Sequence, residues 1–494
     1  HARIKIEELF RQTFDAEDLD YDIHLSESIQ LRLQYTIRIK PGSEVVFDQE
    51  TLERRISELI SDWRSELGQA LLSAFGEARG RKHQREYGDA FPAGYREGYS
   101  PRAAADDVAS IEQLSAEHPL LTRFYHLPED EEDRLRLKVF HLGGPLSLSD
   151  LVSKLENMGL EVAEEQPHRL QTASGKVVSL HDFLLVYSGH IDLVEAGARF
   201  NDAFERVWTG QVEDDGFNRL VLAAGLTWRQ VTVLRTYARY LQQIRFGFSQ
   251  SFISDTLVGH SELSRLLLRC FEARFDVAGK SSLAPKLQGQ ILRALEEVAL
   301  LNEDRILRRI LDLINATKRT NYYRHDDEQP RPFLSLKLSP SEIPDMPRPM
   351  PEFEIFVCAP HFEGVHLRGG RIARGGLRWS DRLEDYRTEV LGLVKAQIVK
   401  NGVIVPTGAK GGFVLKEVRG TSNDVVSCYR QFISGLLDLT DNLIDGEVVP
   451  PEHVVRYDED DPYLVVAADK GTATFSDEAN AISAQYRFLS LIHI

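Results

Sequence analysis

Cysteine and methionine are scarce in this sequence of 494 residues, which contains three of each. The cysteines, Cys270, Cys358 and Cys428, are far apart and odd in number, so no disulfide framework and no zinc-ligand spacing is visible. We therefore expect a protein of the reducing cytoplasm that holds no metal.

The sequence also lacks the apolar run of roughly 18 residues that a membrane helix needs, and its start does not resemble a secretory signal. Acidic residues outnumber basic ones, and the formal net charge is −17. Because nucleic-acid binding needs a basic surface, we expect neither nucleic acid nor a membrane as a partner. An anionic substrate is still compatible with this charge, since a site needs only a local cluster of cations.

The length is too great for one hydrophobic core and predicts three or four domains. Residues 1–125 are expected to form a partial α+β module. Apolar and polar residues alternate over 29–39, which predicts a strand, and the pattern over 49–77 predicts an amphipathic helix. The glycine- and tyrosine-rich segment 80–102 is typical of a linker.

Residues 126–210 are predicted to form a separate unit. Its expected elements are a strand, a helix, two strands and a helix, at 134–141, 148–158, 160–170, 177–188 and 191–208. This order resembles the ACT domain, a ferredoxin-like module that often binds amino acids. A scaffold or an oligomer contact is the favoured role because a fold alone does not give a function, and an amino-acid effector site is the alternative.

Residues 211–329 are expected to be helical, because apolar residues recur at three- and four-residue spacing. The predicted helices span 219–246, 261–275 and 288–317. Trp228, Tyr237 and Tyr240 lie at helical spacing, and we interpret them as core rather than as an aromatic ligand site.

Residues 330–486 are predicted to form an α/β domain. Short strands are expected near 333–338, 353–358, 403–406 and 463–467, separated by glycine-rich loops. Asp381 with Glu384 predicts the start of a helix that continues to Lys400.

Two glycine-rich segments carry cations within this domain. Residues 368–378 combine four arginines with four glycines, and glycine lets a ligand approach while arginine binds carboxylate or phosphate. Residues 408–412 hold Lys410, which is either an acid–base or Schiff-base lysine or an exposed turn residue. Their spacing does not match a P-loop, and no strand–GxGxxG–helix unit occurs in the chain.

The predicted helix between these segments has a polar face. At about 100° per residue, Glu389, Gln397 and Lys400 fall on one side and Lys395 on another. We therefore expect Gln397 and Lys400 to belong to the site, and Lys395 to lie on the surface or behind it.

Taken in order, these segments resemble the glutamate dehydrogenases, above all the large NAD-specific ones. In shorter members the substrate half reads K-G-G-[LI]-R, then a helix with E and Q-x-x-K, then P-x-G-G-A-K-G-G and P-[AS]-P-D-x-[GN]-T. The corresponding segments here are Arg374–Arg378, Glu389 with Gln397 and Lys400, Pro406–Gly412 and Ala467–Thr472, and Ser380–Asn401 is similar to the large subfamily.

The resemblance implies oxidation of L-glutamate to 2-oxoglutarate and ammonia with NAD as hydride acceptor. Lys410 then corresponds to the catalytic lysine and Asp469 to the proton-shuttling aspartate. Lys400, assisted by Gln397, matches the lysine for the α-carboxylate. Arg374, followed by Gly375 and Gly376, replaces the lysine for the distal carboxylate, so which cation binds which carboxylate is open.

The resemblance also implies a homo-oligomer and a dinucleotide-binding domain beyond the substrate half. We accordingly expect a fragment that is inactive alone, with residues 487–494 as foreign sequence. One alternative is a regulatory ACT and helical protein with a non-catalytic dehydrogenase remnant. Another is a leucine or phenylalanine dehydrogenase, against which the cations Arg374 and Arg378 favour a dicarboxylate substrate.

Overall fold

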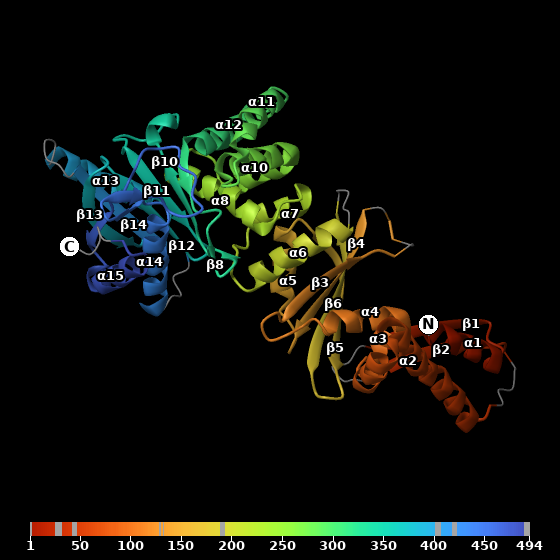
Figure 1. Cartoon of the computed structure of the whole chain (residues 1–494). Helices are drawn as coiled ribbons and strands as arrows, with labels where there is room; N and C mark the ends of the chain where they lie inside the picture. Colours follow the sequence, from red (N-terminus) through yellow and green to blue (C-terminus); the bar gives the residue numbers. More distant parts are fainter. Residues whose placement is uncertain are drawn as a thin grey trace. The chain divides into compact units, whose positions relative to one another are not determined.

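The chain divides into two compact units, His1–Glu156 with Leu160–Glu205 and Asn157–Gly159 with Arg206–Ile494. Figure 1 shows the computed structural model. It describes residues 2–24, 32–41, 47–127, 130–131, 133–187, 193–400, 407–416 and 422–488. None of the described helices is long and apolar enough to span a membrane.

The first unit begins with helices around a two-stranded antiparallel sheet. Its elements are α1 Ala2–Phe14, β1 Asp18–His24, β2 Arg32–Arg38, α2 Gln49–Tyr87, α3 Ala93–Gly98 and α4 Pro101–Ile111. Residues 29–31 of the predicted strand lie outside the described residues.

The linker expected over 80–102 is wrong, since these residues are largely helical and Tyr87, Phe91 and Tyr95 are buried in the core. Its tyrosines and phenylalanine recur every four residues, and Phe91 and Tyr95 pack on Trp63. The glycines and proline of this segment indicated a linker, but the aromatic residues at helical spacing were the better indicator of its structure.

A four-stranded antiparallel sheet in the order β3-β4-β6-β5 follows. The elements are β3 Leu120–Tyr125, β4 Arg134–Leu142, α5 Leu148–Asn157, β5 Glu161–Gln171, β6 Val177–Val186 and α6 Leu193–Trp208. The predicted strand–helix–strand–strand–helix order is confirmed. The sequence interpretation missed β3, which precedes this order and occupies the edge beside β4.

The second unit opens with helices α7 Leu220–Ala223, α8 Trp228–Gln243, α9 Gln250–Gly259, α10 Ser261–Phe275, α11 Ala284–Leu295 and α12 Leu301–Ala316. The single helix expected over 219–246 is two, because Gly225 has φ +64° and Thr227 begins α8 with a capping box. The helix expected over 288–317 is also two, and α9 was missed.

A seven-stranded sheet in the order β17-β13-β14-β12-β11-β10-β7 follows. Its strands are β7 Thr317–Thr320, β10 Leu334–Leu338, β11 Phe353–Cys358, β12 Phe362–Arg368, β13 Ala373–Ser380, β14 Thr407–Leu415 and β17 Val465–Ala468. The strands β14, β13 and β17 are parallel, and the remaining pairs are antiparallel. Two short hairpins join β8 His325–Asp326 to β9 Gln329–Pro330 and β15 Asn442–Ile444 to β16 Glu447–Val449.

Helices cover both faces of this sheet (Figure 1). On one face, α14 Ser422–Leu437 and α15 Ser476–Gln485 share a core with Ile355 and Val357 of β11. On the other face, α8 and α13 Tyr386–Lys400 pack, and Phe356 meets Tyr240 of α8. The alternation along β11 follows the two-residue period of a strand buried on both sides.

Both segments expected as glycine-rich loops are largely strands, β13 and β14. Glycine allows the close packing here, because a Cβ at Gly375 would lie 1.5 Å from the carbonyl oxygen of Ala409. The expected helix start at Asp381 is also wrong: α13 begins at Tyr386, and Arg382 pairs with Asp385 in the turn before it. The strand predicted at 403–406 lies outside the described residues.

Candidate active site

Lys410 and Asp469 meet at the parallel side of the sheet. Lys410 lies on β14, and Asp469 directly follows β17. The Nζ atom of Lys410 donates a hydrogen bond of 2.8 Å to Oδ2 of Asp469, and both side chains are about one-fifth exposed. Asp469 lies beyond the carboxyl end of a parallel strand, where ligands of α/β sheets bind, and Lys410 reaches it from within β14. Because neither side chain is fully buried, a substrate can approach the pair.

Glycines leave the space in which this pair fits. A Cβ at Gly376 of β13 would lie 2.9 Å from the Cβ of Asp469. Gly408 and Gly412 flank Lys410 on the same face of β14, and a Cβ there would collide with Gln397 and Val390 of α13. The surface of the sheet below α13 therefore has glycines, and no side chains, next to Lys410.

Arg378 connects Asp469 to α13. Its Nη2 lies 3.5 Å from Oδ1 of Asp469, and its Nη1 donates to Glu389 at 2.7 Å. Ser380 donates to the other oxygen of Glu389, also at 2.7 Å. The charge of Arg378 is thus neutralised by two carboxylates of the protein, so Arg378 is not available to bind a carboxylate of the substrate.

The loop after β17 fixes Asp469 through its backbone. The backbone N–H of Lys470 donates to Oδ1 of Asp469 at 2.7 Å, and that of Asp469 donates to Thr472 Oγ1 at 3.0 Å. Thr472 donates in turn to the carbonyl of Leu377 on β13.

The surroundings of Asp469 favour its ionised form. Burial raises the pKa of this carboxyl, but the hydrogen bonds from Lys410 and Lys470 and the charges of Lys410 and Arg378 outweigh burial and lower the pKa. The pKa of Glu389 is also lowered, because hydrogen bonds from Ser380 and Arg378 outweigh its desolvation. Both carboxylates are therefore charged at neutral pH.

The remaining predicted residues lie on β13 and α13. Arg374 is exposed and, within the described part of the chain, forms no ion pair. Gln397 is half-buried against Gly408, with no hydrogen-bond partner for its Oε1 among the described residues. Lys395 is exposed, as expected. Lys400 is the last residue of α13, but its side chain lies outside what the structure describes.

The two predicted glycines differ in surroundings. Gly376 makes room for Asp469, whereas Gly375 packs against the backbone of Ala409. The described residues also contain no cluster of three or more His, Cys, Asp or Glu side chains arranged to hold a metal ion.

Sequence reasoning missed the pair of Arg378 and Glu389. Both residues belong to the motifs that carried the resemblance, and their opposite charges were a signal. Their pairing depends on the position of α13 over β13, which the spacing alone does not give.

Models of five successive segments of one enzyme family match the chain in order. They are described as glutamate dehydrogenase ACT2 domain, helical motif 2, ACT3 domain and helical motif 3, and as bacterial NAD-glutamate dehydrogenase, catalytic domain. The matched residues are 1–64, 70–114, 119–197, 212–277 and 290–490. All residues of the candidate site fall in the last segment.

Curated relatives agree with these matches. The NAD-specific glutamate dehydrogenases of Pseudomonas aeruginosa and Halomonas elongata are each 48% identical, over 99% and 98% of this chain. That of Mycobacterium tuberculosis is 39% identical over 99% of the chain. The chain spans only 31–32% of the length of these relatives. The family resemblance carried by the motifs is confirmed, and the chain belongs to the large bacterial NAD-specific glutamate dehydrogenases.

Proposed function

We propose that this chain supplies the glutamate-binding part of an enzyme that oxidises L-glutamate to 2-oxoglutarate and ammonia, with NAD accepting the hydride. The observation that carries the proposal is the hydrogen-bonded pair of Lys410 and Asp469 above a glycine surface. The names of the relatives support the substrate and the cofactor.

Substrate binding is assigned to the cations beside this pair. Glutamate carries two carboxylates and needs a cation at each end. Arg374 is exposed at the start of β13 and supplies one of them. Lys400, with Gln397 one helical turn before it, supplies the other. Because Gly376 has no side chain, the Cα atom of the substrate can lie near Lys410.

Lys410 and Asp469 move the protons of the reaction. Hydride loss from Cα gives an imine, to which water adds before ammonia leaves. The ionised Asp469 accepts a proton from the attacking water. Lys410, which is hydrogen-bonded to Asp469 at 2.8 Å, gives a proton to the departing nitrogen and receives one from Asp469 in return. Arg378 and Glu389 hold Asp469 in place.

No residue of the described part of the chain is assigned to cofactor binding. The sequence has no strand–GxGxxG–helix unit, and the structure shows no such unit among its described elements. The steps assigned to this chain are therefore confined to the glutamate side of the reaction.

For the organisation of the protein we propose domains at 1–125, 126–210, 211–329 and 330–486. We further propose a cytoplasmic homo-oligomer in which the ACT-type segments make subunit contacts or bind an amino-acid effector.

The test is NADH formation from L-glutamate by the full-length protein and by this 494-residue chain. Only the full-length protein should be active. Lys410→Ala and Asp469→Ser should each lower its turnover about 10²- to 10⁴-fold, the usual range for a lost general acid or base. Circular dichroism should show the variants folded.

Lys395→Ala is the matched control, because this lysine is exposed on α13, the helix that packs over β14. The turnover of this variant should equal that of the wild type. Wild-type turnover in Lys410→Ala or Asp469→Ser would remove that residue from the mechanism. A folded but inactive full-length protein would favour a regulatory protein with a dehydrogenase remnant.

A further inference from the structure

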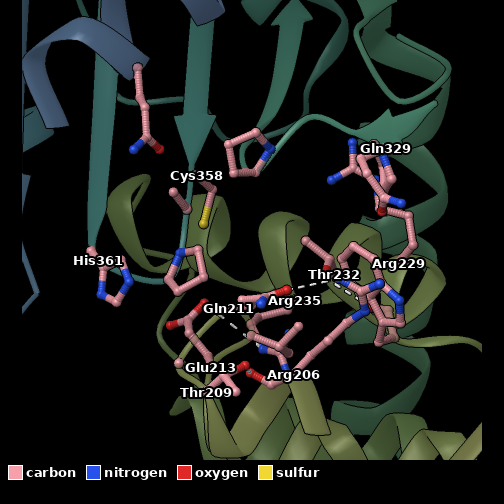
Figure 2. A pocket seen from close by; sticks show the side chains of 18 of the residues that line it. Arg206, Thr209, Gln211, Glu213, Arg229, Thr232, Arg235, Gln329, Cys358 and His361 are labelled. Atoms are coloured by element: carbon pink, nitrogen blue, oxygen red, sulfur yellow. Dashed lines mark hydrogen bonds and ion pairs between the residues drawn. The ribbon is translucent and has the colours of Figure 1, made fainter. Parts of the chain in front are cut away.

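The second unit contains a cavity of about 480 Å³ that shares no residue with the candidate active site. Its lining comes from the segment before η1 (Gly216–Arg219), from α8, from the β8–β9 hairpin and from the turn after β11. Figure 2 shows Arg229 and Gln329 on one side of it and His361 on the other. The volume lies within the range of small-ligand sites in proteins.

Arg229 is the unusual member of this lining. It is only 9% exposed, and no carboxylate of the described residues pairs with it. Its Nη1 donates to the carbonyl of Arg331 at 3.1 Å, and its guanidinium lies 5.5 Å from the ring centre of Tyr322. Its Nε and Nη2 are buried with no hydrogen-bond partner among the described residues.

This Nε/Nη2 edge is the side of arginine that binds an oxyanion with two parallel hydrogen bonds. In two other buried arginines the same edge is filled: Arg235 binds Asp215 and Arg387 binds Glu354 through Nε and Nη2. A buried guanidinium without such a partner is unfavourable. Consistently, burial lowers the pKa of Arg229 to about 10.

The carboxylates that line the cavity already have partners. Glu213 pairs with Lys416 and Arg239, and Asp326 pairs with Arg331. Neither carboxylate is therefore available to neutralise Arg229.

We propose that this cavity binds a small metabolite through an oxyanion group, a carboxylate or a phosphate, that pairs with Nε and Nη2 of Arg229. Because this edge is covered in the structure, binding includes a rotation of the guanidinium toward the cavity. The half-buried ring of Trp228, which packs under Arg206 at 4.5 Å, offers an apolar wall for the rest of the ligand. Sequence reasoning placed Trp228 with Tyr237 and Tyr240 in the core; the two tyrosines are fully buried, but Trp228 lines the cavity.

The test is isothermal titration of the 494-residue chain with succinate and, separately, with inorganic phosphate. At least one should bind at one site per chain, and the one that binds identifies the oxyanion. Arg229→Gln should weaken that binding at least tenfold. Arg374→Gln removes a cation from the proposed substrate site: it should weaken any succinate binding there and leave the binding that depends on Arg229 unchanged.

A second variant guards against misfolding. Thr232→Phe fills the cavity from α8 and leaves Arg229 in place, and it should also abolish binding. Thermal unfolding in the absence of ligand should show that Arg229→Gln is no less stable than the wild type. Absence of binding by both probes, or binding lost in Arg374→Gln but kept in Arg229→Gln, would overturn the proposal, and the latter result would place the anion in the substrate site.

Discussion

At the scale of single residues, the glycines of the candidate site act through the side chain that they lack. Gly376, Gly408 and Gly412 each lie under a side chain that would collide with a Cβ. Their φ angles are not in the left-handed region, so conformational freedom is not the reason for them. The reason is the close approach of Asp469 and α13 to the sheet.

Gly376→Ala tests this role. The added methyl group would meet the Cβ of Asp469 at 2.9 Å and shift the carboxylate away from Lys410. Because a displacement of about 1 Å at a reacting centre can cost about 10²-fold, we expect a loss of that size in NADH formation by the full-length protein, with folding preserved.

Gly392→Ala is the control for this variant. Gly392 lies exposed on α13, and a Cβ there would meet nothing within 4 Å. Turnover should be unchanged, and the free energy of unfolding should rise by up to about 1 kcal/mol through helix propensity. An unchanged rate in Gly376→Ala would show that the carboxylate tolerates displacement.

The sequence identified residues of the candidate site, but it did not show which of their side chains form ion pairs with one another. Lys410 and Asp469 were found through motifs that match a family, and the structure brings them together. The neutralisation of Arg378 by Glu389 and Asp469 was not foreseen, because it depends on three elements meeting. The preference for a dicarboxylate therefore rests on Arg374 and not on Arg378.

At the scale of elements, a buried ion pair helps to hold helix α13 over the sheet. Arg387 binds Glu354 of β11 through two hydrogen bonds of 2.6 and 2.7 Å, and both side chains are almost fully buried. The same helix contributes Glu389 and Gln397 to the site, so this pair positions them indirectly.

Removing one partner should be costly. Arg387→Met leaves the carboxylate of Glu354 buried without a cation, and we expect the free energy of unfolding to fall by about 3–5 kcal/mol. Urea denaturation with linear extrapolation measures it. The double variant Arg387→Met with Glu354→Leu should recover most of this loss, since an apolar pair of similar volume is often neutral. A double variant as unstable as the single one would mean that packing, not charge, is the cause.

Elements with clear hydrophobic periodicity were predicted well, as α10 and β11 show. Errors arose where glycine was interpreted as a loop signal: β13 and β14 are glycine-rich strands because neighbouring backbones and α13 approach them closely. Local patterns do not contain such contacts between segments distant in sequence.

At the scale of the whole molecule, each of the two units has a hydrophobic core of its own. We therefore expect residues 1–205 and 206–494 to fold as separate polypeptides. Their buried carboxyls differ in electrostatic environment, which gives the units different responses to acid.

In the second unit, burial raises the pKa values of Glu213 and Asp461, but neighbouring cations outweigh burial and lower both. For Glu213 these cations are Lys416, Arg235 and Arg239, and for Asp461 they are Lys337 and Arg368. A carboxyl whose pKa is lowered by folding stabilises the folded state at pH values above its pKa in the unfolded chain, which is about 4. This stabilisation is lost as the pH falls through its pKa in the folded chain.

In the first unit, hydrogen bonds from Arg136 lower the pKa of Asp130, whereas burial raises the pKa of Asp182 in spite of hydrogen bonds from Tyr125 and Tyr99. Ionisation of the Asp182 carboxyl opposes folding, so its protonation in acid does not destabilise the folded state.

Between about pH 5 and about pH 3, residues 206–494 should therefore lose stability more steeply than residues 1–205. Urea midpoints of the two polypeptides at both pH values measure the difference. Asp461→Asn in residues 206–494 should reduce the pH dependence of that segment, because the carboxyl that must be protonated is gone. Equal losses in the two segments would show that the buried carboxyls do not control acid unfolding.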